Sequence, residues 1–188
     1  MLVKIYIGIT DYEWYITLKE ANCDEVNFWR PNGNKNFRAL DIGELFLFKL
    51  HSPRNYIVGG GFFLKFSLLP SSLAWEAFGI ANGANSLSEL NERVYKYKNT
   101  NRFLDPDPQI GCIILSKPFF FKEYDWIPVP SNWNNSIQQG KIYDTSEYYG
   151  KLLYEQVQKR IKYQNLKDEI FRERTNYNIE QKRNGKEQ

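Results

Sequence analysis

Segments that favour strands are scattered along this chain among segments that favour helices, without the regular strand–helix–strand order of a parallel α/β protein. Runs rich in apolar and β-branched residues predict strands at 2–9, 37–40, 44–50, 56–66 and 110–115. Capping patterns and amphipathic spacing predict helices at 10–20, 71–79 and 86–98, with a polar, charged helix from about 145. This order predicts a mixed α+β domain around a small curved sheet or barrel, with flanking helices and a charged C-terminal helix.

Two stretches fit a capping box, in which a hydroxyl residue and a glutamate three positions later bond each other's backbone N–H groups. They are Thr10-Asp-Tyr-Glu13 and Ser86-Leu-Ser-Glu89. Residues 27–36 are polar and rich in turn formers, so they predict a loop that carries the aromatic pair Phe28-Trp29.

Three consecutive glycines, Gly59 to Gly61, interrupt the strand predicted at 56–66. Glycine inside a strand marks a bulge or a place where another backbone or a ligand approaches closely. Both interpretations stay open from the sequence.

The length of 188 residues suits one domain with a full core and a small appendage. We expect a domain at 1–155 and a charged helical extension or linker at 156–188, whose last dozen residues are frayed. Residues 1–150 hold 15 Lys/Arg and 16 Asp/Glu, whereas 151–188 hold 10 and 6. A nearly neutral body does not bind polyanions by bulk electrostatics, so any nucleic-acid contact requires a local site.

No apolar run approaches the roughly 20 residues that a membrane helix needs. Met1 to Ile9 is too short, and too interrupted by Lys4, to be a signal peptide. The two cysteines, Cys23 and Cys112, make no disulfide framework. We therefore expect a cytoplasmic protein without a membrane partner.

His51 is the only histidine in the chain. One histidine and two distant cysteines supply neither an HNH nuclease site nor a tetrahedral zinc site. No Gly-x-Ser-x-Gly motif accompanies His51, and Gly59 to Gly61 does not continue into the Gly-Lys-Ser/Thr of a phosphate loop. We expect no catalytic residues, no metal and no cofactor.

Three carboxylates leave one enzymatic alternative open. Asp105, Asp107 and Asp144 could serve a metal-dependent hydrolase, although Pro106 and Pro108 favour a rigid turn around the first two.

The densest cluster of informative residues lies between 25 and 63. A loop that offers Trp29 beside Asn27, Arg30 and Arg38 has what an extruded base requires: a ring to stack on its face and donors to read its edge. Stacking contributes about 1–3 kcal/mol per base. The alternative is that the Phe28-Trp29 pair closes one end of a barrel.

Seven motifs in the chain resemble a known superfamily. They are Val-Asn-Phe-Trp-x-Pro, Gly-Glu-Leu-Phe-Leu-Phe-Lys-Leu-His, Val-Gly-Gly-Gly-Phe-Phe, Leu-Ala-Trp-Glu-Ala-Phe-Gly, Asp-Pro-Asp-Pro-x-Ile-Gly-Cys, Asp-Trp-Ile-Pro-Val-Pro and Gln-Gly-Lys-x-Tyr-Asp, at 26–31, 43–51, 58–63, 73–79, 105–112, 125–130 and 139–144. The pattern is similar to EVE domains, more loosely to YTH and SRA-like readers, and most of all to the N-terminal domain of predicted bacterial HNH restriction endonucleases. Those relatives continue into a Cys/His-bearing nuclease, which these residues lack.

The resemblance implies a PUA-like barrel that holds a modified base in an aromatic pocket. The implied pocket residues are Asn27, Phe28, Trp29, Arg38, His51 and Trp75. Contacts to the DNA backbone or groove are implied for Arg30, Lys35, Lys49, Arg54, Gly60, Gln138, Lys141 and Tyr143.

Structural roles compete with several of these assignments. Arg38 could pair with Asp41 or Glu44, His51 could be a satisfied structural histidine, and Trp75 could belong to the core. The basic residues after 158 predict a solvated face.

The function that the resemblance implies is recognition of modified bases in double-stranded DNA by base flipping. The chain would be the specificity module of an HNH restriction endonuclease, fused or acting in trans, without catalysis of its own. The alternative is an RNA-binding PUA-like protein, which reads single-stranded bases and 2′-hydroxyls.

Overall fold

The computed structural model describes residues 2–32 and 36–184 of the chain. Its strands are β1 (Lys4–Thr10), β2 (Glu25–Arg30), β3 (Leu45–Leu50), β4 (Tyr56–Pro70), β5 (Gln109–Phe120), β6 (Ile127–Pro128) and β7 (Gly140–Asp144). Its helices are α1 (Tyr12–Ala21), α2 (Ser71–Phe78), α3 (Leu87–Lys98) and α4 (Tyr148–Asn184), with the short 3-10 helices η1 (Gly79–Asn82) and η2 (Glu123–Asp125).

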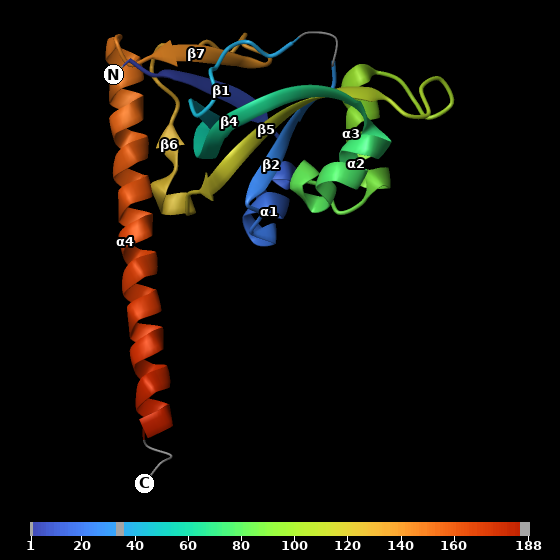
Figure 1. Cartoon of the computed structure of the whole chain (residues 1–188). Coiled ribbons are helices and arrows are strands. Elements are labelled where there is room, and N and C mark those ends of the chain that lie inside the picture. Colours follow the sequence, from blue (N-terminus) through green and yellow to red (C-terminus); the bar gives the residue numbers. More distant parts are fainter. Residues whose placement is uncertain (1, 33–35, 185–188) are drawn as a thin grey trace.

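The strands form one curved sheet in the order β2-β5-β4-β3-β1-β7, with β6 beside one end of β4 (Figure 1). β1 and β3 are parallel, and the other pairs are antiparallel. Within the described residues β2 and β7 end this path without pairing with each other, so the sheet is open. The predicted α+β class, with a curved sheet, flanking helices and a charged C-terminal helix, is confirmed.

Side chains along β1 and β3 alternate between cores on the two faces of the sheet, as the two-residue repeat of a strand requires. Tyr6 and Phe46 point into an aromatic core that α1 covers. Ile5 and Leu45 point into a second core, which the first turns of α4 cover. All six residues of β3 are consequently buried.

A third core joins α2 and α3 to β5. Leu90 and Val94 of α3 pack with Ile110 and Ile114, all of them fully buried. The Ser86 hydroxyl accepts a hydrogen bond from the Glu89 N–H at 3.1 Å, so the predicted N-cap of this helix is confirmed. This packing holds the last turn of α3, which carries Tyr97, over the end of the sheet.

The glycines of β4 let three strands approach one another closely. A Cβ atom on Gly59 would lie 2.2 Å from the Phe119 carbonyl oxygen, and one on Gly60 would lie 2.5 Å from that of Phe46. The prediction that Gly60 contacts DNA is therefore wrong, because the neighbouring strands occupy that space.

Several predicted segments differ in the structure. Residues 27–30, predicted as the first part of a loop, belong to β2, which pairs with β5 along six residues. Residues 37–40 are irregular and form no strand, although Phe37 and Leu40 are buried. Residues 140–144, for which the sequence predicts no strand, pair with β1 as β7. Isolated strand propensity does not reveal which partner a segment finds.

The C-terminal helix α4 is longer than predicted and extends away from the body of the protein (Figure 1). It runs through the predicted boundary at 155/156 and includes 176–184, where the prediction of a frayed end is wrong. Leu153 and Val157 bury themselves against the sheet, and the Arg160 guanidinium donates to the Asp125 carbonyl at 2.6 Å. No helix in the described ranges has the length and apolarity to cross a membrane.

Candidate functional site

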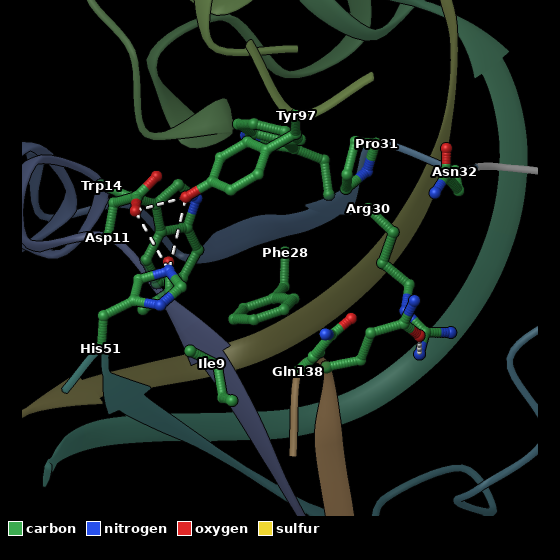
Figure 2. Close-up of a pocket in the computed structure, with 13 residues that line it drawn as sticks. Ile9, Asp11, Trp14, Phe28, Arg30, Pro31, Asn32, His51, Tyr97 and Gln138 are labelled. Atoms are coloured by element: carbon green, nitrogen blue, oxygen red, sulfur yellow. Dashed lines mark hydrogen bonds and ion pairs between the residues drawn. The ribbon is translucent and has the colours of Figure 1, made fainter. Parts of the chain in front are cut away.

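A cavity of about 120 Å³ opens where β1, β2, α1 and α3 meet (Figure 2). Its lining comes from five separate stretches: Ile9, Thr10, Asp11 and Trp14; Phe28, Trp29, Arg30, Pro31 and Asn32; His51; Tyr97; Gln138 and Gln139. The predicted residues Phe28, Trp29, Arg30, His51 and Gln138 are thereby brought together around one cavity.

Aromatic rings form the apolar part of the cavity. Phe28 is buried, and its ring packs against Phe46 and Trp14, with centroids 4.6 and 5.3 Å away. Figure 2 shows the Phe28 ring between the His51 side and the Arg30 side of the cavity. The rings behind Phe28 are locked by the core, so this surface is rigid.

A polar group of three side chains, Asp11, His51 and Tyr97, lines one side of the cavity (Figure 2). The Tyr97 hydroxyl donates to Asp11 Oδ1 at 2.5 Å. His51 Nε2 lies 3.2 Å from the same carboxylate oxygen and 3.3 Å from the hydroxyl. The group therefore presents a carboxylate that two neighbours hold in a fixed position.

The charge of this group follows from its contacts. Burial raises the pKa of Asp11, but hydrogen bonds from His51 and Tyr97 outweigh it, so the pKa lies below its ordinary value. Burial, together with the adjacent Asp11, raises the pKa of Tyr97. At neutral pH Asp11 is thus an ionised acceptor and Tyr97 a protonated donor.

Asp11 is free for this role because it does not cap α1 with its side chain. It is the N-cap residue, yet its carboxylate makes no capping hydrogen bond. The predicted capping box from Thr10 to Glu13 is wrong, since Thr10 is the last residue of β1 and the helix begins at Tyr12.

The opposite side of the cavity carries Arg30. Its guanidinium donates to the Gln139 side-chain oxygen at 3.0 Å and to the Tyr6 hydroxyl at 3.3 Å. Gln138 lies beside it, from the segment that enters β7. The cavity therefore has a carboxylate on one side and a cationic donor on the other.

Trp29 and Asn27 are held by η1. The Trp29 indole donates to the Asn82 carbonyl at 3.0 Å, and Asn27 Nδ2 donates to Asn82 Oδ1 at 2.8 Å. Asn27 is fully buried beneath the cavity and does not line it. The prediction that Asn27 reads a base edge is wrong, because its amide supports the position of β2.

Two further residues predicted for the pocket lie elsewhere. Trp75 packs against the core between α2, α3 and β5, the structural alternative that its helical spacing favoured. Arg38 is exposed and does not line the cavity, and it makes no ion pair with Asp41 or Glu44 within the described residues.

Among the predicted nucleic-acid contacts, Lys49 and Tyr143 are buried. The Lys49 ammonium donates to the Leu50 carbonyl at 2.9 Å and to the Asn55 side chain at 2.8 Å. The Tyr143 hydroxyl donates to the Asn132 side-chain oxygen at 3.0 Å. Both predictions are wrong, because the ammonium of Lys49 and the hydroxyl of Tyr143 donate their hydrogen bonds to other groups of the protein.

The remaining predicted contacts are near or outside the cavity. Lys141 donates to the Asn132 carbonyl at 3.2 Å, which turns its ammonium towards the protein. Arg54 is exposed, and its guanidinium lies 3.9 Å from the centre of the Tyr12 ring. Tyr12 directly follows the cavity residue Asp11 in the chain. Lys35 falls outside the described residues.

Sequence reasoning missed Asp11, Trp14 and Tyr97. The sequence predicts Asp11 only as part of a capping box, and it predicts Trp14 and Tyr97 only as helical residues. Asp11 and Tyr97 are 86 positions apart, so only the packing of α3 brings them together.

The three carboxylates of the enzymatic alternative have separate structural roles. Asp107 accepts from the Ser72 N–H at 2.9 Å at the start of α2, and Asp105 lies 3.5 Å from the Lys98 ammonium. Asp144 accepts from the Ser146 N–H at 2.8 Å. In the part of the chain that the structure describes, no three His, Cys, Asp or Glu side chains cluster as metal ligands would.

No protein-family model matches the chain, and no curated protein matches it. A crystal structure of a mutant ZmASCH protein from Zymomonas mobilis is similar, with a TM-score of 0.49 and 7% identity over 80% of this chain and 95% of that one. The ASCH structure from the same organism gives a TM-score of 0.48 and 8% identity, over 73% and 85% of the two chains. These values describe a likeness in the course of the backbone only.

Proposed function

We propose that this chain is a PUA-like reader that binds one extruded nucleobase in the cavity between Asp11 and Arg30. The observation that carries the proposal is the arrangement of the cavity: a rigid aromatic floor between two sides of opposite polarity. A base needs a ring for its face and fixed polar groups for its edge.

The size of the cavity favours a single ring. An apolar protein cavity of about 150 Å³ accepts one benzene molecule. The cavity here measures about 120 Å³ and is partly open, which fits a pyrimidine more closely than a purine.

The polarity of the cavity favours a base with an amino group. An ionised Asp11 accepts hydrogen bonds and donates none, so it pairs with an exocyclic amine. Arg30 on the other side donates to a carbonyl or ring nitrogen. Cytosine carries both features on one edge, and the partly open cavity leaves room for a modification.

The finer proposal is that the base is a modified cytosine in double-stranded DNA. The chain would then direct an HNH nuclease, fused or separate, to modified DNA, and would act by binding without cleaving the strand. The near-neutral body supports recognition at a local site over bulk attraction to phosphate.

The direct test is binding to matched duplexes at about 0.15 M salt, where weak nonspecific contacts are screened. The duplexes carry at one position unmodified cytosine, each common modified cytosine, methyladenine or thymine. We expect the tightest binding with one modified cytosine, and enhanced fluorescence of a reporter base placed next to that cytosine, because the reporter loses its stacking partner on extrusion.

Matched tyrosine variants link the binding to the cavity. Tyr97→Phe removes the donor to Asp11, and we expect about tenfold weaker binding of the preferred duplex. Tyr95→Phe, on the same helix, loses only an exposed hydrogen bond to the Pro106 carbonyl and should bind normally. Equal, weak and salt-sensitive binding to every duplex, in both variants and the parent, would rule out the reader of modified DNA.

The second candidate is an RNA reader, favoured by the open side of the cavity, which an unpaired base can enter without extrusion. Single-stranded RNA and DNA of the same sequence distinguish the two. Tighter binding of the RNA than of any modified duplex would replace the DNA proposal with this one.

A further inference from the structure

A second, larger depression lies where the middle of α4 stands beside the body. This groove encloses about 710 Å³. Its walls come from the end of α1, the end of β5, the segment around η2, and α4.

The groove has an excess of positive charge. Lys19, Lys122, Lys167 and Arg174 contribute four cations, against two carboxylates. All four side chains are exposed, and none forms an ion pair with a carboxylate elsewhere in the described ranges. These charges remain available to an external anion, since the protein does not neutralise them.

Exposed rings alternate with the cations. Tyr124 and Phe171 are 70% and 72% exposed, although large aromatic side chains are normally buried. The ammonium groups of Lys122 and Lys167 lie 5.9 and 4.4 Å from the centres of the Tyr124 and Tyr163 rings. Rings interleaved with free cations match the two needs of an unpaired nucleotide, a face for the base and a charge for the phosphate.

Helix α1 connects this groove to the cavity. Its N-cap residue, Asp11, lines the cavity, and Lys19 in its last turn lines the groove. Eight residues of helix span about 12 Å, which equals about three to four nucleotides at 3.4 Å each. Figure 1 shows α1 between α4 and the α2–α3 pair.

We propose that the groove binds unpaired nucleotides that flank the base held in the cavity, which a single strand offers directly and a duplex offers where it opens around the extruded base. This inference rests on the proposed function. The cations hold phosphates and the exposed rings stack on bases, so the groove adds affinity without sequence preference, whereas the cavity supplies the selectivity.

The experiment compares short and long single-stranded oligonucleotides, DNA and RNA, of about 4 and 12 nucleotides, each with the preferred base near one end. In the parent chain the longer oligonucleotide should bind at least tenfold more tightly. The variant Lys122→Gln/Lys167→Gln/Arg174→Gln should lose this advantage and bind the short one normally. The slope of log K against log salt should fall by about 2, because each phosphate contact on a single strand contributes about 0.7.

A control variant has the same change in net charge, but the substituted residues lie outside the groove. Lys65→Gln/Arg102→Gln/Lys151→Gln removes three exposed cations outside the groove and should retain the length advantage. Phe171→Ser should weaken binding of the long oligonucleotide without changing the salt slope.

The outcomes separate this inference from the proposed function. If the groove variant keeps the parent affinity and salt slope for the long oligonucleotide, the groove inference is wrong while base selectivity stands. If the parent chain binds no oligonucleotide of either length and no duplex, both proposals fail.

Discussion

The side-chain amides of Asn27 and Asn82 bond each other at 2.8 Å, and both residues are fully buried. Asn82 also donates to the carbonyls of Ala74 and Gly79, at 3.0 and 2.8 Å, and its own carbonyl accepts the Trp29 indole. One residue of η1 thus ties α2 to the strand that carries the aromatic side of the cavity.

Replacing Asn82 with alanine should destabilise the protein strongly. Asn82→Ala leaves the buried Asn27 amide without its acceptor and removes a side-chain donor from the carbonyls of Ala74 and Gly79, and a buried group left unsatisfied costs about 1–3 kcal/mol. We expect the free energy of unfolding to fall by about 2–4 kcal/mol, measured with urea. The exposed Asn178→Ala on α4 should change it by less than about 0.5 kcal/mol. Equal effects of the two substitutions would show that the buried network contributes nothing.

The Asp11 carboxylate should make the free energy of unfolding depend on pH in the acid range. Because the pKa of Asp11 is lower in the folded protein than in the unfolded chain, its contribution is fully present above about pH 4. The contribution is lost as the pH falls through the folded-state value. Between pH 5 and 2 the parent should therefore lose more unfolding free energy than Asp11→Asn. If the free energy of unfolding falls equally with pH in the parent and in Asp11→Asn, the prediction is wrong. Tyr97→Phe should show a dependence on pH between those of the parent and Asp11→Asn.

The buried Lys49 should also make the free energy of unfolding rise with pH, in this case in the alkaline range. Burial lowers its pKa, so between the folded-state value and about 10.5 the unfolded chain binds more protons than the folded protein. The free energy of unfolding should consequently rise with pH through this window in the parent. Lys49→Met should lack the rise, and the exposed Lys65→Met should keep it. Urea unfolding between pH 7 and 10 measures the difference.

Substitution of Gly83 should affect the cavity. A Cβ atom there would lie 2.1 Å from the Trp14 indole, and its φ of +72° disfavours any L side chain. Gly83→Ala should cost about 2–5 kcal/mol, from backbone strain together with overpacking. It should also weaken base binding, because Trp14 lines the cavity.

Gly43 provides the control for that prediction. Its φ is +87°, but a Cβ atom added there would have no neighbouring atom within 4 Å, so Gly43→Ala adds strain without a clash. We expect about 1–2 kcal/mol and unchanged binding. If both substitutions have the same effect on unfolding and on binding, the contact between Gly83 and Trp14 is unimportant.

Most helices and strands can be predicted from the sequence alone, because the type of each element is a local property. The alternation of Ile5, Tyr6 and Ile7 follows from the two-residue repeat of a strand. The N-cap at Ser86 follows from hydrogen bonding within one helical turn. The glycines of β4 follow from the close approach of the neighbouring backbones. The local cluster Phe28-Trp29-Arg30 is likewise recognisable from the sequence as part of the site, because its three residues are consecutive.

Which polar side chains face the cavity depends on the tertiary structure and cannot be predicted from local patterns. Periodicity indicates the face of a strand or helix but not what lies opposite, so Asp11 and Tyr97 become partners only through the packing of α3. For the same reason Lys49, an apparent surface cation in the sequence, donates its hydrogen bonds inside the protein. Contacts between distant segments depend on how the sheet curves and how the helices cover it, and no local pattern contains that information.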